Sequence, residues 1–148
     1  MRFWDTSAIV PLLVRESATD LLLELAGEPE PVFIWWGTSV EVHSALARRE
    51  RDGVLSSAAY AGAISAFLGV VAGWREVSPG DVLRVTAERL LRVHPLRAAD
   101  ALQLAAAAYL AADQGIPVDF VCLDERLRNA AAREGMNVLP IQNNWNQA

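Results

Sequence analysis

The chain has 148 residues, of which 53% are hydrophobic, and its formal net charge at pH 7 is −5. This length predicts one domain with a substantial core, and no apolar run reaches the ~18 residues of a membrane-spanning helix, so we expect no membrane association. A single cysteine and two histidines exclude an internal disulfide and a zinc site built from these ligands, so any metal must be held by oxygen. The first residues lack the pattern of a secretory signal, and we expect a cytoplasmic protein.

The acidic balance is not the usual property of a domain that binds nucleic acid. A group of acids that binds divalent cations would nevertheless raise the negative count without excluding such a partner. All 13 basic residues are arginine, which is well suited to bidentate contacts with phosphate. The net charge therefore leaves nucleic acid open as a partner.

Apolar runs bounded by Gly and Pro alternate with stretches of helical periodicity along the chain. Ser17 and the pair Ser78-Pro79 are expected to start helices. The second helix is predicted to face inward with Leu21, Leu22 and Leu25. In chain order the pattern predicts a strand ending at Asp5, a helix up to Val14, a helix over 18–26, a strand over 32–36, helices over 39–52 and 56–73, a strand over 74–77, a helix over 78–93, a helix from 97 that stops at Gly115, a strand over 118–123, a helix over 124–134 and a strand over 136–140.

This alternation of strands and helices predicts an α/β fold. We expect a three-layer α/β/α sandwich, in which a five-stranded parallel sheet lies between two layers of helices. The domain is predicted to span residues 1–141, and residues 142–148 form a polar tail that we expect to fray.

The helix that begins near residue 97 is apolar on nearly every face, which is typical of a helix covered by other elements. Asp100 is the single carboxylate within this apolar segment. An unpaired buried carboxylate is very costly, so Asp100 must meet water, a partner or a cation. Alternatively, Asp100 is an acid favoured by the helix dipole and paired with Arg97.

Four acids are expected at one edge of the predicted sheet. Asp5 and Asp124 end the first and fourth strands, Glu41 lies in the first turn after the second strand, and Asp100 begins the helix before the fourth. Ligands bind in such sheets beyond the carboxyl ends of the strands, near the switch in strand order. Ionised carboxylates that lie together repel unless a cation sits among them, and hard oxygen ligands point to Mg²⁺ or Mn²⁺.

Each of these acids also has a structural interpretation. Asp5 and Asp124 stand where helices begin, and Asp is a favoured N-cap. The segment Thr38 to Glu41 matches a capping box, in which Glu41 would reach back to the backbone of Thr38. The sequence alone leaves both interpretations open at each position.

Other chemistries find little support in the sequence. A Gly-rich phosphate loop is absent after the first strand, and a Gly-x-Ser-x-Gly elbow is absent throughout. A packing or solvent role is favoured over that of a base for His43, because no partner acid stands at triad spacing. His94 is expected to be structural, and Cys122 is expected to be a small core residue rather than a nucleophile. Trp4, Trp35, Trp36 and Trp74 lie in or beside the predicted strands and are expected in the core or at an interface.

Four segments carry a resemblance to a known family: Asp5-Thr6-Ser7-Ala8, Glu41 to Leu46, Arg97 to Ala105 and Phe120 to Leu127. With these segments, the chain from Met1 to about Pro140 resembles a PIN-domain ribonuclease of the VapC type, the toxin of a toxin–antitoxin pair. The resemblance implies that Asp5, Glu41, Asp100 and Asp124 form the catalytic metal-binding quartet, that Thr6 or Ser7 supports it, and that Mg²⁺, replaceable by Mn²⁺, assists RNA hydrolysis. The expected partners are RNA, a small antitoxin and a second copy of the chain. We expect RNA to be held by Arg48, Arg49 and Arg51 or by Arg126 and Arg128; alternatively, each group is a solvated helix face.

One departure from the family pattern is Cys122, where the family often has Ser or Thr two residues before the last Asp. A hydroxyl group that assists the metal or the substrate is missing there. This departure is the only sequence support for an alternative, a catalytically silent PIN-fold binding or assembly module. A different Mg²⁺-dependent phosphohydrolase is disfavoured, because Asp5-Thr6-Ser7 lacks the second Asp expected of an aspartyl-phosphate enzyme.

Overall fold

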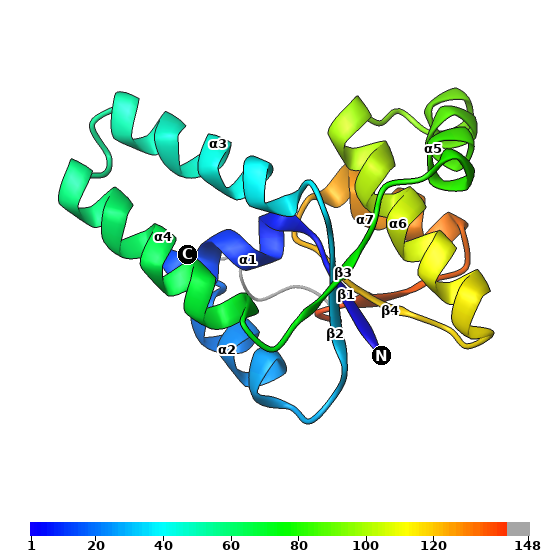
Figure 1. Ribbon diagram of the computed structural model, residues 1–148, viewed down its shortest axis with the longest axis horizontal. Coiled ribbons are helices and arrows are strands. Elements are labelled where there is room, and N and C mark those ends of the chain that lie inside the picture. The colour runs from blue at the N-terminus through cyan, green and yellow to red at the C-terminus, as the bar shows by residue number, and fades with distance from the viewer. Residues whose placement is uncertain (142–148) are drawn as a thin grey trace.

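A five-stranded parallel sheet forms the centre of the computed structural model, which describes residues 1–141 (Figure 1). The strand order is β3-β2-β1-β4-β5, so β1 lies between β2 and β4. Phe3 of β1 pairs with Phe33 on one side and with Phe120 on the other. The strands are β1 (Arg2–Trp4), β2 (Val32–Trp35), β3 (Arg75–Val77), β4 (Asp119–Val121) and β5 (Asn137–Leu139).

Helices cover both faces of the sheet, as predicted (Figure 1). The first four helices pack on one face and the last three on the other. The helices are α1 (Thr6–Leu13), α2 (Thr19–Gly27), α3 (Thr38–Arg51), α4 (Ser57–Val71), α5 (Asp81–Val93), α6 (Ala98–Gln114) and α7 (Glu125–Arg133). The α/β fold class and the parallel sheet are therefore confirmed.

Successive strand residues supply the two halves of the core. Phe3 and Phe120 stack with their ring centroids 5.7 Å apart in the cluster beneath α5, α6 and α7. Their neighbours Trp4 and Val121 belong to the cluster beneath α1 to α4. Because side chains alternate across a strand, burial on both faces requires the continuous apolar runs seen in the sequence.

Two predicted helix starts are wrong. The N-cap of α5 is Gly80 rather than Ser78, because residues 78–80 are used to connect the end of β3 to the helix layer. Ala18 rather than Ser17 precedes α2. The Thr19 hydroxyl holds this turn instead, since it accepts a hydrogen bond from the Glu16 amide and donates one to the Pro11 carbonyl.

The predicted inner face of α2 is only partly correct. Leu22 is fully buried, whereas Leu21 is 37% exposed. This helix packs at the margin of the core, so only a narrow stripe of its surface is covered.

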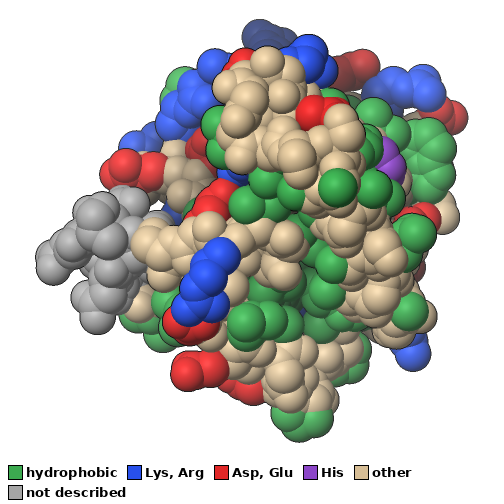
Figure 2. Space-filling view, turned by 90° about the vertical axis from the view of Figure 1, so that its left-hand side faces the viewer, with side chains coloured by type: hydrophobic (Ala, Val, Ile, Leu, Met, Phe, Trp, Pro, Cys, Tyr) green, Lys and Arg blue, Asp and Glu red, His purple; other side chains and the backbone are tan. Residues whose placement is uncertain are grey.

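Exposed hydrophobic side chains occur on the face that carries α3 and α4, which Figure 2 shows as green patches between isolated charges. Val40, Val54 and Leu68 are each more than half exposed. Within residues 1–141, no helix is long and apolar enough to cross a membrane. The polar tail predicted over 142–148 lies outside the described residues.

Candidate active site

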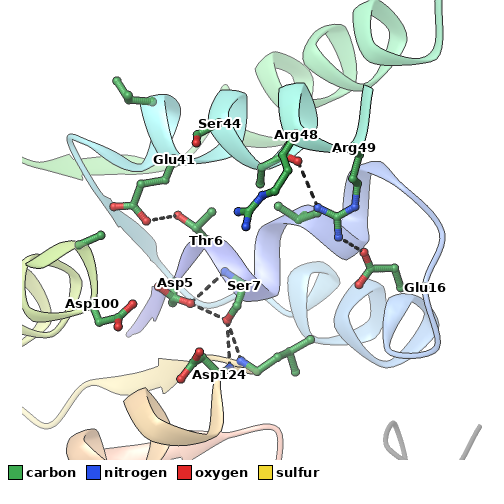
Figure 3. A pocket seen from close by; sticks show the side chains of 15 residues that line it. Asp5, Thr6, Ser7, Glu16, Glu41, Ser44, Arg48, Arg49, Asp100 and Asp124 are labelled. Atoms are coloured by element: carbon green, nitrogen blue, oxygen red, sulfur yellow. Dashed lines mark hydrogen bonds and ion pairs between the residues drawn. The ribbon is translucent and has the colours of Figure 1, made fainter. Parts of the chain in front are cut away.

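A cleft of about 670 Å³ opens where β1 and β4 lead into their helices, and all four predicted acids line it (Figure 3). Asp5 and Asp124 come from the starts of α1 and α7, Glu41 from the first turn of α3, and Asp100 from the first turn of α6. The central place of β1 explains this meeting, because it brings the ends of β1 and β4 side by side.

Asp5 is the most deeply buried of these acids, at 5% exposure. Its Oδ2 accepts hydrogen bonds from the Ser7 amide at 2.9 Å and from the Ser7 hydroxyl at 2.5 Å, so Asp5 is the N-cap of α1. Burial raises the pKa of Asp5, and the negative charge of Asp100 adds to this effect. The N-cap interpretation is thus correct, and it does not remove Asp5 from the cleft.

Glu41 does not form the capping box that its spacing suggested. Its Oε2 accepts hydrogen bonds from the Thr6 hydroxyl at 2.9 Å and from the Gln103 side-chain amide at 3.1 Å. Gly37 is the N-cap of α3 and gives no side-chain cap. Burial raises the pKa of Glu41, with further contributions from the charges of Asp5 and Asp100. Hydrogen-bond donors from α1 and α6 therefore take the place of the Thr38 backbone amide that a capping box would use.

Asp100 and Asp124 are anchored by backbone amides. Asp100 Oδ2 accepts a hydrogen bond from the Arg97 amide at 3.1 Å, and Asp124 Oδ1 accepts one from the Leu127 amide at 3.0 Å. Asp100 lies in the first turn of α6, as the helix-dipole alternative expects, but within residues 1–141 it makes no ion pair with the Arg97 guanidinium, so only that half of the alternative is wrong.

One pattern is common to all four carboxylates. In each, one oxygen is fixed by the protein while the other has no hydrogen-bond donor within residues 1–141. The second oxygen of Asp124 has only a distant ion pair with Arg126, at 3.9 Å. Four carboxylates, each with one oxygen that accepts no hydrogen bond, therefore line the cleft. Within residues 1–141, the thiol of Cys122 behind Asp5 is the only soft ligand beside them.

The Ser7 hydroxyl joins the two central strand ends. Besides donating to Asp5, its oxygen accepts hydrogen bonds from the Leu123 amide at 2.9 Å and the Asp124 amide at 3.3 Å. The thiol of Cys122 lies in the same network, 3.6 Å from Asp5 Oδ2. Burial, then the charge of Asp5, raises the pKa of Cys122 well above its usual value, which agrees with the expectation of an inert core residue.

The arginines differ in what they contact. Arg49 pairs with Glu16 at the rim of the cleft, whereas Arg48 points into the cleft and makes no ion pair among the residues described (Figure 3). Arg128 donates to the carbonyl groups of Cys122, Leu139 and Pro140 at 2.6–3.0 Å, so it ties β5 to the end of β4. The guanidinium of Arg128 is thus engaged within the fold, whereas its expected role in holding RNA stays a prediction.

The two histidines lie away from the cleft. His43 Nδ1 is 2.8 Å from the Ser39 carbonyl oxygen, and its ring meets Tyr60 edge-on. His94 is buried, and its Nε2 is 2.7 Å from Glu134. Both have the packing roles expected of them.

The donor atoms of the cleft fit a hard divalent cation, since they are carboxylate oxygens that carry several negative charges. Within residues 1–141, however, the acidic, histidine and cysteine side chains are not already drawn into a group of three or more that could hold a metal. The four carboxylates therefore line the same cleft but are spaced more widely than the ligands around a bound metal ion.

No sequence motif assigned a role to Gln103. This side chain is fully buried and lies one helical turn beyond Asp100, on the same face of α6. A polar residue inside an otherwise apolar helix is the signal that would have identified it.

Comparison with known proteins places the chain in a family. Over 140 residues, the chain is 31% identical to ribonuclease VapC45 of Mycobacterium tuberculosis, and the alignment covers 95% of both sequences. The chain belongs to the VapC ribonuclease family. No family model matches it.

Solved structures agree with the VapC fold. M. tuberculosis VapC20, described as a toxin that cleaves the sarcin–ricin loop, aligns with a TM-score of 0.68 and 20% identity, covering 95% of this chain and all of that one. A toxin–antitoxin complex from Klebsiella pneumoniae contains a chain that aligns with a TM-score of 0.54 and 16% identity, covering 95% of this VapC chain and 97% of that one. At these identities, the two structures support the fold alone.

Proposed function

We propose that this protein is a divalent-cation-dependent endoribonuclease, that Asp5, Glu41, Asp100 and Asp124 hold its cation, and that it is the toxin of a toxin–antitoxin pair. The observation that carries the proposal is the set of four carboxylates in one cleft, each with one fixed oxygen and one that accepts no hydrogen bond within residues 1–141. Membership of the VapC family supports RNA as the substrate.

The protein's own residues prepare the cleft for a cation and a phosphate. Ser7 fixes the orientation of Asp5, and Thr6 fixes that of Glu41. Mg²⁺ bound there would supply Lewis-acid activation of the scissile phosphate and of the attacking water. The carboxylates orient that water, and the guanidinium of Arg48 binds a neighbouring phosphate of the RNA.

The proposed partners follow from charge and exposed surface. An acidic cleft in a chain of net charge −5 suits an antitoxin segment that carries a basic side chain. The exposed hydrophobic side chains of Leu68 on α4 and of Val54 in the connection between α3 and α4 suit association with a second copy of the chain. The K. pneumoniae toxin–antitoxin complex supports the antitoxin partner by analogy of fold.

Cleavage of a defined RNA by the purified protein tests this function. We expect cuts with Mg²⁺ or Mn²⁺, none with a chelator, and none from the Asp100→Asn variant with either metal. A protein that binds Mn²⁺ in calorimetry but cuts no RNA would refute the nuclease. A protein that does neither would favour the silent binding module.

A further inference from the structure

Gln103 occupies an unusual position between three elements of the fold. Its side chain is completely buried on α6, and its Nε2 lies 3.0 Å from Thr6 Oγ1, 3.2 Å from Thr38 Oγ1 and 3.1 Å from Glu41 Oε2. The acceptors belong to α1 and α3, whereas Gln103 and Asp100 belong to α6, and all three helices contribute residues to the cleft. One amide group therefore connects three helices that line the cleft.

This arrangement is costly for a residue that only fills space. The amide nitrogen has two hydrogens for its three neighbouring acceptors. The Oε1 of Gln103 is buried and has no hydrogen-bond partner within residues 1–141. An unsatisfied buried polar atom destabilises a fold, and an apolar side chain of similar size would avoid this cost.

The hydrogen bond from Gln103 to Glu41 indicates a function for this buried amide. Gln103 and Thr6 both donate to Oε2 of Glu41, and Oε1 of the same carboxylate has no donor among the described residues. Two donors from two elements fix the position of the carboxylate, since rotation about its last bond would break both hydrogen bonds. The unpaired oxygen then stays on the side of the group away from these donors.

We propose that Gln103 is a positioning residue, which holds Oε2 of Glu41 so that Oε1 remains available to the divalent cation. The inference rests on the proposed function, because it presumes that Glu41 is a ligand. Asp100 lies one turn before Gln103 on α6, so a single helix supplies one carboxylate and orients another.

Calorimetric titration with Mn²⁺ tests the proposal on the full chain. Gln103→Met keeps the length of the side chain and removes its amide. We expect this variant to bind Mn²⁺ about 10- to 100-fold more weakly than the wild type, the range found when partners of metal ligands are removed. Leu110→Ala is the matched control, because Leu110 is buried on the same helix but lies outside the cleft. This control should lower the melting temperature and leave the Mn²⁺ affinity unchanged.

A second measurement needs no variant of Gln103. In the wild-type protein labelled with ¹⁵N-glutamine, addition of Mg²⁺ should shift the side-chain amide signals of Gln103. The signals of Gln114, at the exposed end of α6, should stay in place and serve as the internal control.

The outcomes separate this inference from the proposed function. Equal Mn²⁺ affinity of the wild type and Gln103→Met, or Gln103 amide signals that ignore bound Mg²⁺, would overturn the positioning role while leaving the cation site intact. A wild-type protein that binds neither cation would overturn both. If Gln103→Met does not fold, the amide signals decide.

Discussion

Removal of the Ser7 hydroxyl would show how much its hydrogen bonds contribute to the free energy of unfolding. In Ser7→Ala, Asp5 loses a donor at 2.5 Å, and the amide of Leu123 loses its acceptor at 2.9 Å. A hydrogen bond to a charged group is worth roughly 1.5–3 kcal/mol, and an amide left without a partner costs about 1–3 kcal/mol more. Water in the open cleft recovers part of this loss, so we expect a net destabilisation of about 3 kcal/mol. At roughly 2–4 °C per kcal/mol for a chain of this size, the melting temperature should fall by about 6–12 °C.

Urea unfolding followed by circular dichroism measures this change. The midpoint should fall while the slope stays the same, which indicates a loss of stability rather than a change in the unfolded chain. Ser44→Ala is the matched control, because Ser44 lines the same cleft but makes no hydrogen bond through its side chain in the part of the chain described. This control should stay within about 0.5 kcal/mol of the wild type. Equal stability of the two variants would refute the role assigned to the Ser7 hydroxyl.

Three further predictions concern charge. Asp5→Asn should lower metal-dependent RNA cleavage by at least about 100-fold yet keep the wild-type circular dichroism spectrum, since Asn is an equally good N-cap; cleavage at the wild-type rate would contradict this. Arg48→Ala should weaken RNA binding and reduce the slope of log affinity against log salt by about 1, whereas Arg49→Ala, whose guanidinium pairs with Glu16, should change the slope less. The hydrogen bond from Arg89 lowers the pKa of Glu134, so its contribution to stability is present above its unfolded pKa and is lost as the pH falls through the lower folded value. Glu134→Gln should therefore be less stable than the wild type at pH 7 by about 1 kcal/mol, and the difference in urea midpoint should disappear as the pH falls below the folded pKa of Glu134; a difference that does not change with pH would refute this.

The acidic cleft was predictable from the sequence because it follows from topology. Asp5 and Asp124 stand at the ends of apolar runs, and adjacent parallel strands must bring such positions together. The structural and functional interpretations of these two residues proved compatible, since a capping carboxylate uses one oxygen and keeps the other. A local motif therefore does not exclude a role in the cleft.

Side-chain contacts between separate elements of the fold could not be predicted from the sequence. The spacing of Glu41 suited a capping box, but the packing of α6 against α1 and α3 supplied better donors. Arg48 and Arg128 look alike in the sequence, yet Arg128 is held by three carbonyl groups and Arg48 points into the cleft. Only the tertiary arrangement distinguishes them.

The order of the strands also determines when the cleft can exist during synthesis. Two of its acids come from the first third of the chain, but Asp100 and Asp124 follow much later, and β1 must wait for β4 before its second edge is paired. A nascent chain on the ribosome is therefore without a complete cleft until residue 124 has emerged. If the four acids act together as we propose, the growing chain stays inactive until Asp124 has joined the other three acids.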